Sequence, residues 1–372
     1  MMIYFAGFIL SLASVSHGAS WDATRMDSMT IMIGIDSVDV VTVAGAASDN
    51  YQGMGVLRST DGGKTSQFYT PAGGAMNMDI AENDKGVSVV AYLGGLSVSQ
   101  NGETYTRVPD IVAGSQSANS FGSSSFGVTG PIVSKEAKSQ VNGVAVSLDD
   151  AKSWSMYDIG LNATNYPARY GAFPSDTTWY VSAGHWPYDS TLNKETHTPL
   201  SARVHMSKDT AQASHLTGLQ GPPPAAPGDG DGDGYIGAIA KTTDGGQTWS
   251  QVYSTDSYYF NAIHCSTTED CVAVMENGGD AAAVWSSDGG RTWTTVLHDT
   301  GFSFMAAFMV SPTEAWVGGG AKSAHFWHTV NAGADWELTT LPGAYVAYLD
   351  FNDGVGYAST LGASTCSIMK YA

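Results

Sequence analysis

The chain is short of basic residues. Its 372 residues include 16 Lys and Arg against 35 Asp and Glu, and the formal net charge at pH 7 is −19. A surface of this sign repels the phosphates of nucleic acids and the head groups of anionic membranes. The composition therefore predicts a soluble acidic protein whose partner is not a nucleic acid.

Long hydrophobic runs are also missing. The apolar run Ile3–Ala13 is about a dozen residues long, which is too short to span a bilayer. Small residues at 16–20 follow it, as they do in secretory signals, although no Lys or Arg precedes it. We therefore predict a signal peptide over residues 1–19, a secreted protein and no membrane span.

Cysteine is rare as well, with three residues in the chain. Cys265 and Cys271 flank five residues and stand on the two arms of a predicted hairpin, where a disulfide can bridge them. Such a bond fits an oxidising compartment. The sequon at Asn162, in a predicted loop, is a glycosylation site if the protein is secreted by a eukaryote.

What the chain does contain is a repeat. The segment Ser-Ser-Asp-Gly-Gly-Arg-Thr-Trp begins at Ser286, and close copies begin at Thr242 and Ser59. Weaker copies begin at Ser99, Ser147 and Thr329. In chain order the copies are 40, 48, 95, 44 and 43 residues apart, and the gap of 95 is one period lengthened by an insert. A period in the forties is typical of a β-propeller.

Each copy has the chemistry of a tight turn. Asp or Asn before Gly-Gly calls for positive φ, which glycine adopts without steric penalty. The Ser or Thr hydroxyl and the Asp carboxylate can bond nearby backbone N–H groups, and the following Trp can pack between neighbouring blades. The motif resembles the Asp-box (BNR) repeat of sialidases, xyloglucanases, sortilin-type propellers and Ycf48-type photosystem II assembly factors. That resemblance implies structural hairpin turns remote from any active site.

The strands around the copies predict an all-β fold: a single β-propeller of four-stranded antiparallel blades over residues 20–372. One blade reads as 260–264, 271–275, 282–286 and 293–297. The last repeat supplies three strands, so Ser20–Thr24 is expected to close it as the fourth strand and remove two exposed sheet edges. This count predicts seven blades, with six or eight left open because Ser207–Asp209 resembles a decayed copy.

Blade topology separates two ends. The repeated turns and the Cys265–Cys271 hairpin share one end, and the links between blades share the other, where irregular segments gather. A long insert at about 185–234 also leaves from that second end. The residues predicted to contact a ligand there are His185, Trp186, Tyr188, Arg169, Tyr258, Tyr259 and His325.

The insert ends in alternating Gly and Asp. Asp229, Asp231 and Asp233, followed by Gly and an apolar residue, resemble the first half of an EF-hand calcium loop. The twelfth position is Ala240, so the bidentate Glu is missing. The alternatives are a weak calcium site, which would be the only cofactor, and a flexible acidic linker.

Two functions remain open. The first is a secreted, non-catalytic binding or scaffold propeller that recognises a glycan or an extracellular protein on the face opposite the repeated turns. The alternative is a carbohydrate-active enzyme, either a polysaccharide lyase or a sialidase-like hydrolase, with its site on that same face. A sialidase needs three arginines around the substrate carboxylate, and three of the six arginines here, Arg58, Arg107 and Arg291, belong to the repeated turns or their strands. The binding protein is the favoured reading.

Overall fold

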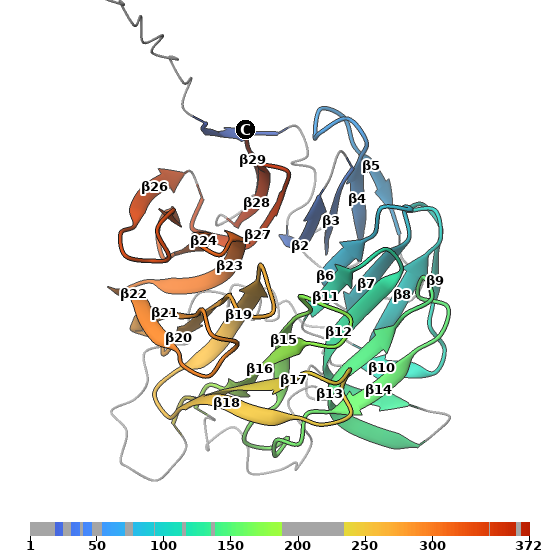
Figure 1. The fold of residues 1–372 in the computed structure, drawn as a ribbon. Helices are drawn as coiled ribbons and strands as arrows, with labels where there is room; N and C mark the ends of the chain where they lie inside the picture. The colour runs from blue at the N-terminus through green and yellow to red at the C-terminus, as the bar shows by residue number, and fades with distance from the viewer. Residues whose placement is uncertain are drawn as a thin grey trace, which may run out of the picture.

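Short antiparallel sheets follow one another along the chain and surround a central axis (Figure 1). The computed structural model describes residues 19–24, 31–37, 40–46, 54–70, 77–92, 94–113, 117–134, 138–187, 234–341, 343–361 and 366–372. Within these ranges every regular element is a strand. No helix in the described part of the chain has the length and apolar character needed to cross a membrane.

Blades 1 to 3 occupy the first part of the chain, and each is a separate sheet. Blade 1 consists of β2 (Ile31–Ser37), β3 (Val41–Ala46), β4 (Met54–Ser59) and β5 (Gln67–Tyr69). Blade 2 consists of β6 (Asn77–Glu82), β7 (Ser88–Tyr92), β8 (Gly95–Ser99) and β9 (Tyr105–Arg107). Blade 3 has β10 (Ile111–Ala113) and β11 (Ser117–Phe121) on one side of β12 (Ser125–Ser134), followed by β13 (Ser139–Ser147) and β14 (Ser155–Asp158).

Blades 4 to 6 repeat the same order of strands. Blade 4 is β15 (Ala168–Ala172), β16 (Trp179–His185), β17 (Ile236–Thr242) and β18 (Ser250–Thr255), and the insert joins β16 to β17. Blade 5 is β19 (Tyr259–Cys265), β20 (Cys271–Glu276), β21 (Asp280–Ser286) and β22 (Thr294–Thr300). Blade 6 is β23 (Ser303–Ser311), β24 (Glu314–Gly320), β25 (Ala324–Thr329) and β26 (Glu337–Leu341).

Blade 7 joins the two ends of the chain. It contains β27 (Tyr345–Asn352), β28 (Val355–Leu361) and β29 (Cys366–Tyr371), and β1 (Trp21–Ala23) pairs with β29 as the fourth strand. One bridge, Gly320 to Tyr345, links this blade to blade 6. The described strands therefore form seven blades closed by the N-terminal strand, as predicted. The possible extra repeat at 207–209 lies outside the described residues.

Trp21 shows why closure is stable. Its side chain is buried and lies 5.6 Å from Trp316, 4.4 Å from Phe326 and 5.4 Å from Tyr371, measured between ring centroids. Buried aromatic clusters of this kind remove a large apolar area from water. The first strand is therefore held by side-chain packing as well as by backbone pairing.

Most of the core lies between blades. The buried hydrophobic residues form separate clusters, and each cluster draws on two neighbouring blades. One example packs Val272 and Val274 of blade 5 against Phe304 and Val317 of blade 6. The strands concerned are rich in β-branched residues and are buried on both faces, which is typical of sheets packed face to face.

The repeated turns form one end of the propeller, which we call the box end. In the turn at Ser286, the Ser286 hydroxyl donates to Asp288 Oδ1 (3.0 Å), and Gly290 N–H donates to the Ser286 oxygen (2.9 Å). Thr292 Oγ1 then donates to Asp288 Oδ2 (2.7 Å). Gly289 and Gly290 have φ of 72° and 80°, as the sequence predicts for these positions.

Four of the six box turns, those that begin at Ser147, Thr242, Ser286 and Thr329, donate a backbone hydrogen bond to the first hairpin of their own blade. Gly289 N–H donates to the Glu269 carbonyl (3.0 Å), and Gly245 N–H donates to that of Thr177 (2.9 Å). The Trp after the turn reaches the preceding blade, since Trp336 Nε1–H donates to the Val296 carbonyl (3.0 Å). The box end is thus held by backbone hydrogen bonds within blades and by a side-chain hydrogen bond between blades 5 and 6.

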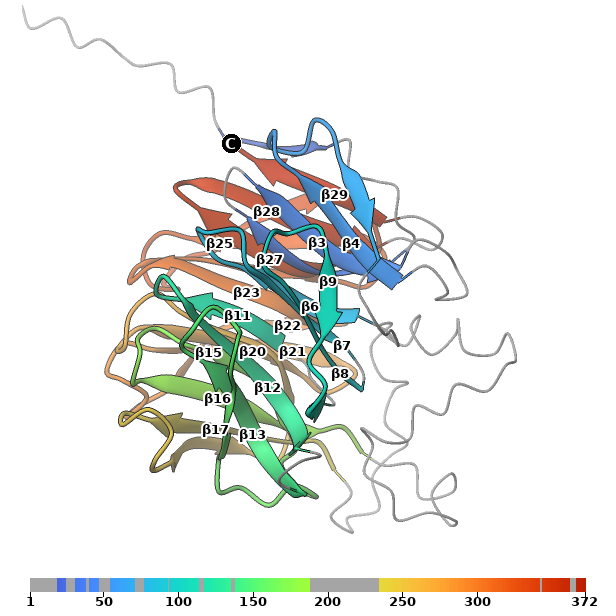
Figure 2. The ribbon, with the colours of Figure 1, turned by 90° about the vertical axis from the view of Figure 1, so that its right-hand side faces the viewer.

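We call the opposite end, from which the insert leaves, the insert end. The links between blades and the turns between second and third strands lie there. Figure 2 shows the propeller from the side.

Candidate functional site

Arg169 stands at the insert end on the innermost strand of blade 4. It occupies a β-bulge of β15, between Ala168 and Tyr170. Its Nε–H donates to the carbonyl of Phe260 in blade 5 (2.9 Å). This is the one hydrogen bond of its guanidinium group within the described residues. No described residue accepts a hydrogen bond from its two terminal nitrogens.

Three aromatic rings surround that guanidinium. Its central carbon lies 5.0 Å from the Tyr259 ring centroid, 5.4 Å from that of Tyr170 and 5.5 Å from that of Trp186. A cation within about 6 Å of a ring face is attracted by the ring quadrupole. The rings pack around the side chain and restrict its movement.

The rings belong to a larger aromatic group. Trp186 meets Tyr259 edge to face (5.4 Å), and Tyr235 stacks on Tyr259 (5.9 Å). Trp186 directly follows β16 and Tyr235 directly precedes β17, so both flank the insert. We call Arg169, Tyr170, Trp186, Tyr235 and Tyr259 the aromatic cluster.

A buried carboxylate lies behind the cluster. Glu276, at the end of β20, is 1% exposed, and its Oε1 accepts a hydrogen bond from the Tyr259 hydroxyl. Its Oε2 is buried and has no hydrogen-bond partner in the described part of the chain. Burial and the Glu276 charge raise the pKa of Tyr259 well above its usual value and that of Tyr235 to about 12. Both tyrosines therefore stay protonated at neutral pH, and the hydroxyl proton of Tyr259 is donated to Glu276.

The other predicted contacts in this region differ in exposure. His185, the last residue of β16, is 8% exposed, and its Nδ1–H donates to the Trp186 carbonyl (2.6 Å). The imidazole therefore holds the backbone at the end of this strand. Tyr258 precedes β19 and packs against the cluster that contains Phe260. Burial, with a smaller contribution from the Asp280 charge, raises its pKa.

His325 is at the same end but on another blade. It lies on β25, the third strand of blade 6, where its Nε2 bonds the Ser323 hydroxyl (2.9 Å) and its ring lies 4.5 Å from that of Phe302. Third strands lie outside the innermost strands that carry Arg169 and Tyr259. The structure therefore brings Arg169, Trp186 and Tyr259 together, and His325 is not part of that group.

The remaining predicted residues are placed as follows. Cys265 and Cys271 are joined by a disulfide across the first hairpin of blade 5, at the box end. Asn162 is exposed in the link between blades 3 and 4, where its Oδ1 accepts from Thr164 N–H (2.9 Å). Tyr188, Asp229, Asp231 and Asp233 lie outside the described residues, so the calcium site stays a prediction.

The central channel holds a polar group that sequence reasoning missed. Asp79 of blade 2 accepts hydrogen bonds from the Tyr348 hydroxyl of blade 7 (2.7 Å), from Ala118 N–H of blade 3 (2.8 Å) and from Ile80 N–H (2.9 Å). Burial is the main cause that raises the pKa of Asp79 to about 7. This side chain ties three blades across the axis, between residues 269 positions apart.

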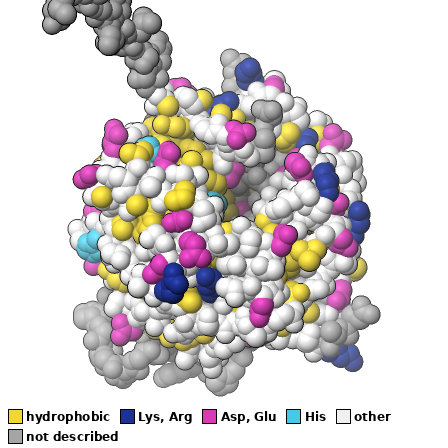
Figure 3. All heavy atoms as spheres, viewed as in Figure 1, with side chains coloured by type: hydrophobic (Ala, Val, Ile, Leu, Met, Phe, Trp, Pro, Cys, Tyr) yellow, Lys and Arg dark blue, Asp and Glu magenta, His cyan; other side chains and the backbone are white. Residues whose placement is uncertain are grey.

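The box end presents a different surface. Figure 3 views this end, where the centre of the ring is hollowed and hydrophobic side chains gather on one side of the opening. An ion pair also links neighbouring blades at this end, between Arg58 of blade 1 and Glu82 of blade 2 (2.8 Å).

Comparison with solved structures agrees with the architecture. The chain is similar to Ycf48 from Cyanidioschyzon merolae, with a TM-score of 0.57 and 12% identity over 95% of this chain and 98% of the other. A structure of Ycf48 bound to D1 peptide matches with a TM-score of 0.57 and 13% identity over 95% and 96%. Virginiamycin B lyase from Staphylococcus aureus matches with a TM-score of 0.58 and 10% identity over 94% and 98%.

Identities this low establish the fold alone. The chain is a β-propeller, as the repeats predicted, and its fold is similar to that of Ycf48 and of virginiamycin B lyase. No protein-family model matches it, and no curated protein does either. The propeller neighbours include a protein solved with a bound peptide and an enzyme.

Proposed function

We propose that this protein is a secreted, non-catalytic binding propeller that recognises a glycan or a protein partner at its insert end. The observation that carries the proposal is the aromatic cluster around Arg169, whose terminal nitrogens have no acceptor among the described residues. The secreted location rests on the sequence of residues 1–19.

The chemistry of the cluster suits recognition. Aromatic rings offer flat apolar area to a sugar ring or a peptide side chain, and the guanidinium offers fixed donors to a carboxylate or a carbonyl. Trp186 is partly exposed, so a ligand can reach it. Interfaces are dominated by a few aromatic and Arg residues of this kind.

The geometry favours binding over the lyase alternative. A lyase base has to reach the proton it removes, and His185 is largely buried with its Nδ1–H already donated to a backbone carbonyl. Two tyrosines of the cluster, Tyr235 and Tyr259, have raised pKa values, so neither is an easily ionised base.

Two matched tryptophans test the proposal. The mature protein is screened on a glycan array and a peptide array, together with Trp186→Ala at the insert end and Trp336→Ala at the box end. Both side chains are partly buried, so both substitutions remove comparable packing. We expect Trp186→Ala to weaken the selected ligand at least tenfold, and Trp336→Ala to lower thermal stability with unchanged affinity. A ligand held equally well by the Trp186 variant, or no ligand on either array, contradicts the proposal.

A further inference from the structure

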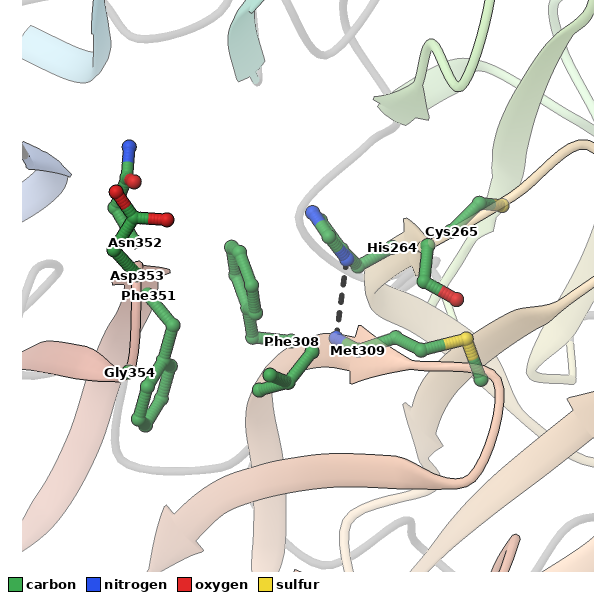
Figure 4. Close-up of a pocket in the computed structure, with 10 residues that line it drawn as sticks. His264, Cys265, Phe308, Met309, Phe351, Asn352, Asp353 and Gly354 are labelled. Carbon is green, nitrogen blue, oxygen red and sulfur yellow. Dashed lines mark hydrogen bonds between the residues drawn. The ribbon is translucent and has the colours of Figure 1, made fainter.

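The box end has a cavity of its own, at the mouth of the channel where blades 5, 6 and 7 meet. Its volume is about 340 Å³, and the ends of β19, β23 and β27 line it (Figure 4). Ligand cavities in proteins begin at about this size. Arg169, Trp186 and Tyr259 do not line it, so it is separate from the aromatic cluster.

His264 supplies one wall in a defined protonation state. Its Nδ1 accepts a hydrogen bond from the backbone N–H of Met309 (3.0 Å), so a neutral ring must carry its proton on Nε2. Burial lowers the pKa of His264 to about 4, so the ring is neutral at neutral pH. Stacking on Phe308, at 3.9 Å between centroids, fixes its orientation.

The Nε2–H of His264 is left facing the opening. Figure 4 shows this nitrogen pointing away from Met309, toward the gap between the strand ends. No described residue accepts a hydrogen bond from it. Close by, the hydroxyl of Ser266 is buried and has no hydrogen-bond partner among the described residues.

The facing wall offers acceptors. Asn352 and Asp353 lie at the tip of the β27–β28 hairpin, across the opening from His264 (Figure 4). Asp353 is exposed, with φ of 49°. Phe308 and Phe351 supply the apolar part of the lining.

We propose that this box-end cavity is a second binding site and that its ligand is a neutral sugar ring. A ligand must accept from the Nε2–H of His264 and donate to the carboxylate of Asp353, and each hydroxyl of a sugar can do both. An anion would satisfy His264, but it would meet Asp353 and a chain of net charge −19. A simple cation would satisfy Asp353 and leave the His264 donor unpaired, which is costly in a partly buried site.

The test uses four neutral disaccharides: maltose, cellobiose, lactose and laminaribiose. Binding is followed by saturation-transfer NMR and by the ¹⁵N resonance of His264 Nε2, with glucuronic acid and glucosamine as charged controls. We expect at least one disaccharide to bind and to shift that resonance, and both charged sugars to bind at least tenfold more weakly.

Three variants locate the binding. His264→Phe keeps a ring on Phe308 and removes the donor, so it should weaken the disaccharide at least tenfold. Asp353→Asn keeps a residue that tolerates positive φ, and it should weaken disaccharide binding about threefold. If the His264 variant does not fold, the Asp353 variant tests the site by itself. Trp186→Ala, at the other end, should leave this affinity unchanged while it impairs the proposed insert-end ligand.

The outcomes that overturn the proposal are specific. They are no binding by any of the four disaccharides, preference for a charged sugar, or binding that survives both His264→Phe and Asp353→Asn. Loss of disaccharide binding in Trp186→Ala alone would place the sugar at the insert end and remove the second site.

Discussion

The two ends of this propeller are built from the same strands but differ in the segments that connect them. At the box end, one turn is repeated in six blades, and in each the Ser or Thr hydroxyl donates to the Asp or Asn side chain two residues later. At the insert end the links differ from blade to blade, and one of them brings an arginine into a group of aromatic rings. The repeated turns, whose polar groups bond to one another, are typical of a scaffold. Side chains whose hydrogen-bonding groups have no partner among the described residues are typical of a ligand site.

The box end is interrupted once, in blade 7, where two chain termini replace a turn. Trp21 holds that junction, so Trp21→Ala should lower the free energy of unfolding by about 3–5 kcal/mol. Asp22→Ala, on the exposed side of the same strand, should change it by less than about 0.5 kcal/mol. Urea unfolding of both variants checks this. Equal stabilities would show that the first strand does not close the ring.

The free energy of unfolding should depend on pH through Asp79, which lies between the two ends of the propeller. Asp79 has a pKa near 7 in the folded protein and an ordinary value in the unfolded chain, so between about pH 4 and pH 7 the folded state holds a proton that the unfolded state has lost. Stability from this group is therefore present at pH 4 and declines as pH rises to 7, by at most about 4 kcal/mol.

The measurement is the unfolding free energy at pH 4, 5.5, 7 and 8 for the wild type and for Asp79→Asn. The variant cannot titrate at this position, so the difference between the two should change across that window and level off above pH 7. A difference that stays constant from pH 4 to pH 8 would contradict the assignment.

Glycines at the two ends should differ in their tolerance of a side chain. Gly246 in a box turn has φ of 85°, and an added Cβ would lie 2.7 Å from Tyr157 and 2.8 Å from Trp179. Gly301, in a link at the insert end, has φ of 82° and open space around it. Gly246→Ala should therefore cost about 3 kcal/mol and Gly301→Ala about 1–2 kcal/mol, because only the first adds a clash to the backbone strain.

Thermal melting of these two variants, with Gly279→Ala as a control, separates the contributions. Gly279 has neither a positive φ nor a neighbour within 4 Å, so its variant should melt like the wild type. If Gly246→Ala and Gly301→Ala lose the same stability, close packing of the box turn against the preceding blade is not important.

The smallest expected effect concerns exposed carboxylates. Asp288 accepts from Thr292 and Ser286 in its box turn, and these bonds hold its pKa at about 2. Because the folded pKa is below the unfolded one, this stabilisation is present above about pH 4 and is lost as pH falls toward 2. Asp288→Asn should lower the melting temperature by a few degrees at pH 7 and by less at pH 2.5, while Asp256→Asn at the insert end should not. A lowering that is as large at pH 2.5 as at pH 7 would argue against the carboxylate as the cause.

Much of the fold could be predicted from the sequence because its determinants are local. The Asp-Gly-Gly turns, their spacing and the Trp-led first strand each depend on residues close together in the chain. Strand bounds were less secure: the strand predicted at Trp293 begins at Thr294, since the indole belongs to the turn.

The site was predictable only in part. Topology indicated that Arg169, Trp186 and Tyr259 share one end, but not that Arg169 would reach the carbonyl of Phe260, because that contact depends on a β-bulge. Glu276 and Tyr235 were missed as members of the group. Asp79 and Tyr348 give no local signal of their contact, and the cavity beside His264 needs three strand ends that meet only in the folded ring.

Hydrogen exchange with and without the ligand selected on the arrays tests the central claim most directly. The account predicts new protection in the peptides around Arg169, Trp186 and Tyr259, with no change in the box turns at Thr242 and Ser286. Protection confined to the box turns would contradict it, because the turns assigned here as scaffold would then be the part that binds this ligand.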